Sequence, residues 1–206
     1  MAPPRLEFWF EFASTYSYLS ALRLPMLAAQ VGAEVTWRPF LLGPIFKAQG
    51  WETSPFKMYP AKGSYMWRDV ARRAHALGLR FTRPDPFPQN GLMAARVATS
   101  ALPGKAGIAF CHNIYLAEFA EGMDISDEAV VAACAKAAGL PDEILQTAQS
   151  DPVKHALRQT TEDAARHGLF GAPSFRVGGE LFWGDDRLEE AMTWAQHTAV
   201  ETGHAP

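Results

Sequence analysis

Cysteine is scarce in this sequence. Of the 206 residues only two are cysteines, Cys111 and Cys134, and they lie far apart in the chain. No CxxC motif exists, so neither a local redox pair nor a zinc knuckle can form. Both residues lie in segments with helical periodicity. We expect small, buried, unpaired side chains, because a reducing compartment disfavours a disulfide between them.

Long apolar runs and an excess of one charge are also missing. No window approaches the roughly 18 consecutive apolar residues of a membrane span, and residues 1–10 contain no apolar stretch of signal-peptide type. We therefore expect a cytoplasmic protein without membrane contacts. The formal net charge of −3 gives no general electrostatic reason to bind nucleic acid. A small molecule is the expected partner.

The histidines do not form a metal-binding pattern. All fall singly on predicted helices or at the C-terminal tail, without the spacing of metal ligands: His75, His112, His155, His167, His197 and His204. We expect structural or solvated histidines and no metal. With 48% hydrophobic residues, the chain has enough apolar material for one sizeable core, or for one domain with a helical insertion.

The N-terminal part of the chain predicts a βαβ unit. Between Leu6 and Phe12, aromatic and aliphatic residues alternate with a period of two, which is typical of a strand. From Ser14 to about Val31 apolar residues recur at helical spacing, and Gly32 provides a C-terminal stop. Residues 33–40 predict a second strand. A βαβ crossover requires that the two strands run parallel.

The rest of the chain predicts helices followed by a hairpin and a last helix. Residues 42–166 carry no strong strand signal but several Ala-rich amphipathic runs broken by Pro and Gly. Gly178-Gly179 forms a two-residue turn between two short strands, and a last helix starts near Asp186. This order predicts an α/β, thioredoxin-like fold (βαβ…ββα) with an all-helical insertion. Residues 1–41 and 167–206 would form the thioredoxin-like domain, and residues 42–166 the insertion domain.

Ser14 is the first candidate for chemistry, because it lies where a strand passes directly into a helix. The unpaired N–H groups and partial positive charge of a helix N-terminus stabilise anions and thiolates. Serine is also a preferred N-cap for purely local reasons. Position alone therefore leaves both roles open.

Two further candidate segments lie near the C-terminus. Pro173 opens a strand after a helix, although an ordinary strand-starting proline would look the same. Gly184, Asp185 and Asp186 follow an aromatic strand end, where N–H groups beside a carboxylate could hold an amino-acid head group. Helix capping explains the same acids. A thioredoxin-like fold brings these segments close to Ser14, so the combination is more specific than any member.

The motifs together resemble a known family. They are residues 12–18 (Phe-Ala-Ser-Thr-Tyr-Ser-Tyr), residues 59–69, and residues 168–173 with residues 182–187. On these segments, and over almost the whole chain, the sequence is similar to the glutathione-dependent 2-hydroxychromene-2-carboxylate isomerases. That family is related to kappa-class glutathione transferases within the DsbA-like thioredoxin superfamily. The resemblance implies glutathione as the cofactor, and a homodimer.

The resemblance also implies a set of site residues. Ser14 would hydrogen-bond the glutathione sulfur and help to keep it as thiolate. The other implied contacts are the backbone of Ala172 with the cysteinyl unit, a cis peptide bond at Pro173, and Gly184, Asp185 and Asp186 with the γ-glutamyl end.

The sequence departs from the family pattern at two positions. Thr15 follows Ser14, where relatives have proline. Trp51 stands where kappa-class enzymes use an asparagine near the peptide, which puts a contact at Trp51 in doubt. Lys62, if it faces the site, would instead meet the glycine carboxylate of glutathione.

The implied activity is isomerisation of 2-hydroxychromene-2-carboxylate to trans-o-hydroxybenzylidenepyruvate, or of a similar aromatic carboxylate from aromatic catabolism, with glutathione as a borrowed nucleophile. The alternatives are a kappa-class-like glutathione transferase and a non-catalytic glutathione-binding protein. A disulfide oxidoreductase needs thiols where Ser14 and Ser17 stand, which nearly excludes it. Several aromatic residues could line a pocket for a planar acid or belong to the core: Trp9, Trp51, Tyr65, Trp67 and Trp183.

Overall fold

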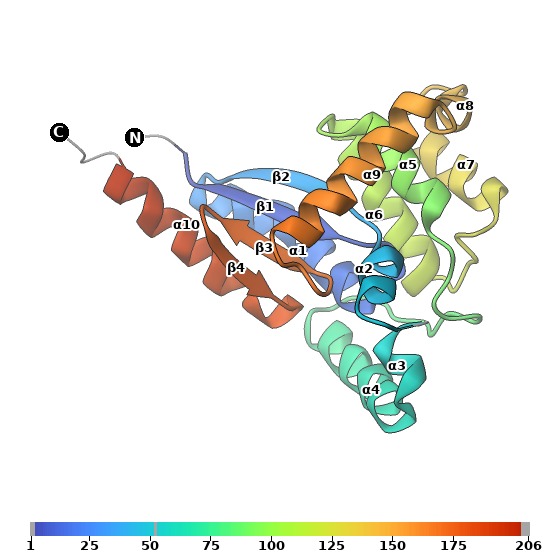
Figure 1. Ribbon diagram of the computed structural model, residues 1–206, viewed down its shortest axis with the longest axis horizontal. Coiled ribbons are helices and arrows are strands. Elements are labelled where there is room, and N and C mark those ends of the chain that lie inside the picture. The colour runs from blue at the N-terminus through green and yellow to red at the C-terminus, as the bar shows by residue number, and fades with distance from the viewer. Residues whose placement is uncertain (1–2, 52, 203–206) are drawn as a thin grey trace.

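A mixed sheet forms the centre of the computed structural model, which describes residues 3–51 and 53–202 (Figure 1). Its strands β1 (Arg5–Phe10), β2 (Glu34–Pro39), β3 (Ser174–Val177) and β4 (Glu180–Trp183) lie in the order β2-β1-β3-β4. β1 pairs with β2 in parallel and with β3 antiparallel, and β3 pairs antiparallel with β4. The predicted parallel βαβ unit and the C-terminal hairpin are both confirmed.

The two faces of β1 pack against different parts of the molecule. Leu6, Phe8 and Phe10 belong to a large core with residues of α1 (Thr15–Val31) and α10 (Leu188–Thr202). Trp9 points to the other face, where it packs with Phe40 and with Ala164 of α9. The alternating side chains of β1 therefore pack against helices on opposite faces of the sheet. As predicted, α1 ends at Gly32, whose φ of 65° is the left-handed conformation that glycine adopts easily.

Every regular element that the structure describes between β2 and β3 is a helix. The series is α2 (Leu42–Ala48), α3 (Pro55–Met58), α4 (Pro60–Ala76), α5 (Leu92–Ala101), α6 (Lys105–Phe119), α7 (Glu128–Ala137), α8 (Ile144–Ala148) and α9 (Asp151–Arg166). The large core runs continuously from Phe8 in the sheet to Phe110 and Tyr115 on α6. The division into two domains stays a prediction.

The start of the last helix differs from the sequence prediction. We expected a helix from about Asp186, but Asp185–Arg187 form a 3-10 turn and α10 begins at Leu188. Within this turn Asp185 directs its side chain into the protein, where only 1% of the residue is exposed.

The two cysteines behave as expected. Cys111 on α6 and Cys134 on α7 are both free and buried. In the part of the chain that the structure covers, no helix has both the length and the apolar character needed to cross a membrane.

Candidate active site

Ser14 is the N-cap of α1 and also links α1 to a distant segment. Its hydroxyl oxygen accepts a hydrogen bond from the Ser17 N–H at 3.2 Å, which satisfies one of the unpaired donors of the first turn. The same hydroxyl donates to the carbonyl oxygen of Ala172 at 2.9 Å. The local and the long-range roles that the sequence left open are thus both present in one side chain.

The segment that receives the Ser14 hydrogen bond has the predicted backbone. The peptide bond between Ala172 and Pro173 is cis, as expected. Ala172 is partly exposed, and its backbone N–H has no hydrogen-bond partner within the described residues. Beside Ser14 the chain therefore offers one free donor and one carbonyl, which are the two groups that an extended peptide needs for pairing.

Gly184 joins the third predicted segment to the second. Its N–H donates to the carbonyl oxygen of Pro173 at 3.0 Å. Its φ of 112° lies in a region that side-chain-bearing residues rarely adopt. A Cβ at this position would also lie only 2.5 Å from an Asp186 carboxylate oxygen. The φ therefore favours glycine here, and the Gly184 N–H fixes this turn to the backbone at Pro173.

The Asp185 side chain is engaged inside the protein, and its contact with the γ-glutamyl end stays a prediction. Its carboxylate accepts hydrogen bonds from the Ser20 hydroxyl at 2.9 Å and from Arg23 Nη2 at 2.6 Å on α1. Arg73 on α4 donates to the other carboxylate oxygen through Nε at 2.9 Å and through Nη2. With both oxygens engaged inside the protein, the Asp185 side chain ties together α1, α4 and the start of α10.

Asp186 is the acid that faces outward. Its side chain is 57% exposed, and its one ion pair within the described residues is a contact of 3.8 Å with Arg187, which is also exposed. Surface ion pairs of this kind contribute little. Of the two neighbouring acids, only Asp186 has a carboxylate that is free for a ligand.

Trp51 and Lys62 are not joined to Ser14 by any contact among the described residues. The Trp51 ring packs against Phe46 with centroids 5.6 Å apart. Lys62 is exposed on the first turns of α4, with Nζ 5.6 Å from the Tyr59 ring centroid. Their contacts with glutathione stay predictions.

The helix that carries Lys62 is nevertheless fixed to the start of α1. The hydroxyl of Tyr16, two residues after Ser14, donates to the Asp69 carboxylate on α4 at 2.9 Å. Burial and the hydrogen bond to Asp69 raise the pKa of Tyr16, so the phenol stays protonated. Further along α4, Arg73 makes the ion pair with Asp185.

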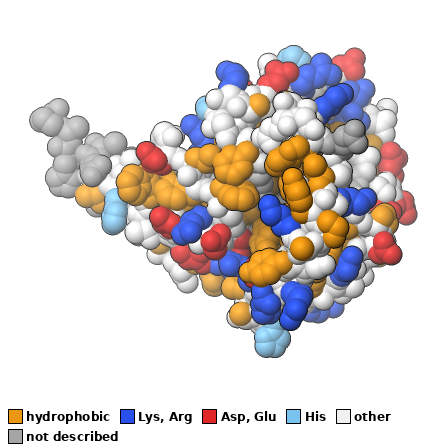
Figure 2. All heavy atoms as spheres, turned by 60° about the horizontal axis from the view of Figure 1, so that its bottom comes forward, with side chains coloured by type: hydrophobic (Ala, Val, Ile, Leu, Met, Phe, Trp, Pro, Cys, Tyr) orange, Lys and Arg blue, Asp and Glu red, His pale blue; other side chains and the backbone are white. Residues whose placement is uncertain are grey.

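A cavity of about 390 Å³ lies between α3, α4 and residues 83–87. Figure 2 shows that hydrophobic side chains gather in the middle of this side of the molecule, with Lys and Arg side chains among them. Of the aromatic residues named as pocket candidates, only Trp67 lines this cavity. The lining residues are Phe56, Lys57, Met66, Trp67, Arg83, Pro84, Asp85 and Phe87.

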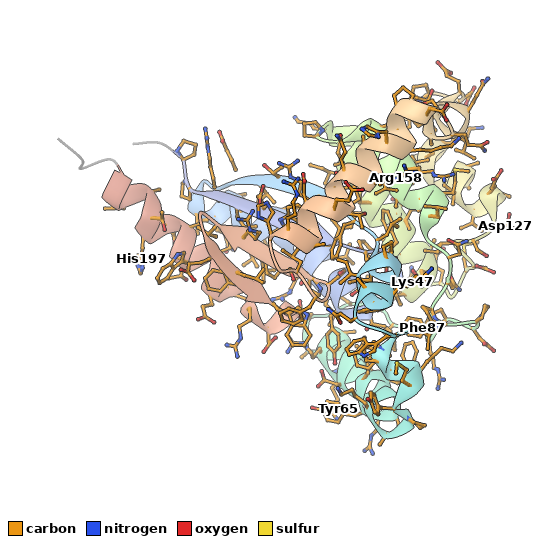
Figure 3. All side chains as sticks on the ribbon, viewed as in Figure 1. Lys47, Tyr65, Phe87, Asp127, Arg158 and His197 are labelled. Carbon is orange, nitrogen blue, oxygen red and sulfur yellow. The ribbon has the colours of Figure 1, made fainter. Side chains whose placement is uncertain are left out.

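Arg83 is held in place by an aromatic ring at this cavity. Its guanidinium carbon lies 4.8 Å from the centroid of Trp67, and Trp67 makes an edge contact of 4.6 Å with Phe87. Figure 3 shows Phe87 beside α3 and α4. Neither Arg83 nor Lys57 makes an ion pair within the part of the chain that the structure describes. The cavity thus combines aromatic walls with two cations and one carboxylate, that of Asp85.

Sequence reasoning missed two carboxyl groups with perturbed surroundings. Glu11 follows β1 directly and lies three residues before Ser14, and Glu118 is completely buried on α6. Burial raises the pKa of Glu11 to about 7, and burial with the nearby Glu11 holds the pKa of Glu118 well above its ordinary value. A signal was available, because Glu118 stands alone in the apolar run from Ile114 to Ala120.

Comparisons with known proteins agree with this geometry. A family model described as a DSBA-like thioredoxin domain matches residues 5–193. The chain is 29% identical over 185 residues to a 2-hydroxychromene-2-carboxylate isomerase of Sphingobium xenophagum, covering 89% of this chain and 94% of that protein. It is 27% identical over 206 residues to glutathione S-transferase kappa 1 of Homo sapiens, covering 91% and 88%.

A similar fold is found among solved structures. A 2-hydroxychromene-2-carboxylate isomerase structure superposes with a TM-score of 0.85 at 22% identity, covering 97% of this chain and 98% of that chain. The predicted thioredoxin-like fold is confirmed.

Proposed function

Because the chain belongs to the DSBA-like thioredoxin domain family, we propose that it is a glutathione-dependent isomerase of 2-hydroxychromene-2-carboxylate, or of a similar intermediate of aromatic catabolism. Its relatives along nearly the whole chain are isomerases and glutathione transferases, which supports an enzyme. The observation that carries the proposal is the Ser14 hydroxyl, which lies at the N-terminus of α1 and is hydrogen-bonded to Ala172.

The groups around Ser14 fit a thiol-containing peptide. The N-terminus of α1 stabilises a negative charge, which a thiolate needs. Ala172 offers its free N–H and its carbonyl to the cysteinyl unit. When a ligand N–H occupies the Ala172 carbonyl, the Ser14 hydroxyl is released to hydrogen-bond the sulfur instead. Binding of the peptide and stabilisation of the thiolate are thus coupled through one hydroxyl.

The γ-glutamyl end fits at the third segment. Asp186 presents an exposed carboxylate to an ammonium group, while Asp185 keeps this turn attached to α1 and α4. Gly184 lets the ligand approach the backbone closely. Lys62 on α4 is the cation we assign to the glycine carboxylate, and we place Trp51 at the edge of the peptide.

When bound, glutathione supplies a thiolate that adds to the conjugated side chain of the ring-opened substrate, allows a carbon–carbon bond to rotate, and is expelled. The cavity beside α4 suits the second ligand. Arg83 presents a guanidinium fork, which matches a carboxylate, and Phe56 and Phe87 supply apolar walls for a planar ring. Met66 and Trp67 line this cavity within a turn of Asp69, the partner of Tyr16.

An assay with 2-hydroxychromene-2-carboxylate, with and without glutathione, tests the proposal. We expect trans-o-hydroxybenzylidenepyruvate to form only when glutathione is present, and the amount of free glutathione to stay constant. Absence of a glutathione-dependent rate, with this substrate and with related aromatic acids, would contradict an isomerase.

A kappa-class-like transferase is the second candidate, because the human kappa relative is nearly as similar as the isomerase. It would consume glutathione and release a stoichiometric conjugate with an electrophile. A non-catalytic glutathione-binding protein would bind glutathione without either rate. The homodimer and the cytoplasmic location stay predictions.

A further inference from the structure

Every buried side-chain atom without a hydrogen-bond partner in the described residues belongs to one of three residues. They are the hydroxyl of Ser17, the amide nitrogen of Gln89 and both carboxyl oxygens of Glu118. Glu118 and Ser17 are completely buried, and Gln89 is 6% exposed. An unpaired carboxylate in such a place costs far more free energy than a neutral carboxyl group.

Two of these residues, Gln89 and Glu118, are each connected to the Glu11 side chain. The Gln89 side-chain oxygen accepts from the Ile125 N–H at 2.9 Å. A Cβ built on Gly91 would lie 3.6 Å from the Ile125 side chain and 3.7 Å from a carboxyl oxygen of Glu11. Glu11 in turn interacts electrostatically with Glu118.

Glu11 also lies next to Ser14 at the start of α1. The Ser14 N–H donates to the Glu11 carbonyl at 3.1 Å, and the Glu11 carboxyl group is hydrogen-bonded by the backbone of Ala13. On the inner side, the Tyr115 hydroxyl donates to the Glu11 carbonyl at 3.1 Å. Glu11 is partly exposed near the Ser14 end of α1, whereas Glu118 is completely buried in the core.

No cation faces this pair among the described residues. The titratable groups that interact with it are Tyr115 on α6 and Asp124 after α6, neither of which carries a positive charge. Two carboxyl groups in a buried site without a cation cannot both ionise at ordinary pH. Burial also raises the pKa values of Tyr115 and Cys111, so both stay neutral.

We propose that Glu11 and the buried Glu118 form a carboxyl pair in which Glu118 keeps a proton, and that Glu11 is the base that accepts the proton of the glutathione thiol. The second part rests on the proposed function. Glu11 enters as a carboxylate and gains an O–H bond, while the S–H bond of glutathione breaks and leaves its electron pair on sulfur. The proton returns to sulfur when glutathione leaves, so no other reactant is needed.

The protonated state of Glu118 can be tested without glutathione. The infrared spectrum of the wild-type protein at about pH 8, where Glu11 is mostly ionised, should contain the C=O stretch of a buried, protonated carboxyl group. Glu118→Gln should remove this band. Glu121→Gln is the matched control, because Glu121 is exposed just beyond α6 and pairs with Arg80, and it should keep the band. A band that survives in Glu118→Gln, or is missing from the wild type, overturns the pair.

The role of Glu11 predicts how many protons glutathione binding releases. Calorimetry in buffers of different ionisation enthalpy measures this number. At about pH 5.5 Glu11 is already protonated, so the thiol proton goes to the buffer and the wild type should release close to one proton. At about pH 8 Glu11 is ionised and accepts the thiol proton. The number of protons released should therefore fall toward zero. Glu11→Gln should release about one proton at both pH values, whereas Glu118→Gln and Glu121→Gln should follow the wild type.

The outcomes distinguish a failure of Glu11 as the base from a failure of the proposed function. A wild-type release of protons that does not change with pH, or Glu11→Gln behaving as wild type, overturns Glu11 as the base while the proposed function stands. If wild type binds no glutathione, the proposed function fails together with the role of Glu11. The infrared band then still decides whether the carboxyl pair exists.

Discussion

The neighbouring acids Asp185 and Asp186 should respond in opposite ways to the same substitution. Asp185→Asn removes the charge that holds Arg23 and Arg73, whose side chains are 12% and 32% exposed. Breaking a fully buried ion pair costs about 3–5 kcal/mol. Because water reaches part of Arg73, we take the lower end, about 3 kcal/mol. That is a large share of the stability of a typical domain.

For a chain of this size, such a loss lowers the melting temperature by about 6–12 °C. Asp186→Asn should leave the melting temperature unchanged, because its one described ion pair is long and exposed and Gly184, not Asp186, is the N-cap of the 3-10 turn. It should instead weaken glutathione binding. Loss of a charged hydrogen bond at an exposed position corresponds to about a tenfold rise in Kd, with kcat preserved at saturation.

Urea unfolding of both variants measures the change in stability, and titration calorimetry measures the change in glutathione affinity. If Asp185→Asn is as stable as the wild type, the ion-pair cluster does not hold the turn. If Asp186→Asn binds glutathione with unchanged affinity, our placement of the γ-glutamyl end is wrong.

Three other substitutions test the remaining parts of the site. Ser14→Ala should lower the rate at saturating glutathione by about 10- to 100-fold, and an unchanged rate would remove Ser14 from the mechanism. Gly184→Ala should destabilise the protein by about 1–3 kcal/mol in urea unfolding, because of its positive φ and the close Asp186 oxygen. Glu118 keeps its proton when folded but loses it on unfolding above its ordinary pKa of 4.5. Wild-type stability therefore falls as pH rises, and Glu118→Gln should gain up to about 1.4 kcal/mol per pH unit relative to the wild type above about pH 5. Parallel stability curves across pH would refute a protonated Glu118.

The elements that the sequence predicted well are those determined by local rules. The alternation around Phe8, the stop at Gly32 and the turn at Gly178-Gly179 each depend on neighbours within a few residues. Ser14, Pro173 and Gly184 could be named because they stand at element ends. The matched family then explains why these ends meet.

The role of Asp185 could not be predicted in this way. Its partners Ser20 and Arg73 lie 165 and 112 residues away in the chain. Acids in a first helical turn are favoured by the helix dipole whether or not they have distant partners. The sequence therefore could not tell which of the two acids turns inward. That choice depends on two arginines placed by other helices.

The contrast between a capping serine and a catalytic serine, which the sequence posed for Ser14, disappears in the structure. One hydroxyl has both an acceptor and a donor function, and here it accepts from Ser17 while donating to Ala172. Only the acceptor of the Ser14 O–H group is exchanged when a sulfur replaces the carbonyl, so the cap can persist throughout the reaction. Ser14→Ala therefore removes the N-cap as well as the catalytic hydroxyl, and we expect it to lower the free energy of unfolding by about 1 kcal/mol in addition to lowering the rate. Asp127→Ala, which removes the N-cap of the remote α7 (Figure 3), measures that contribution separately.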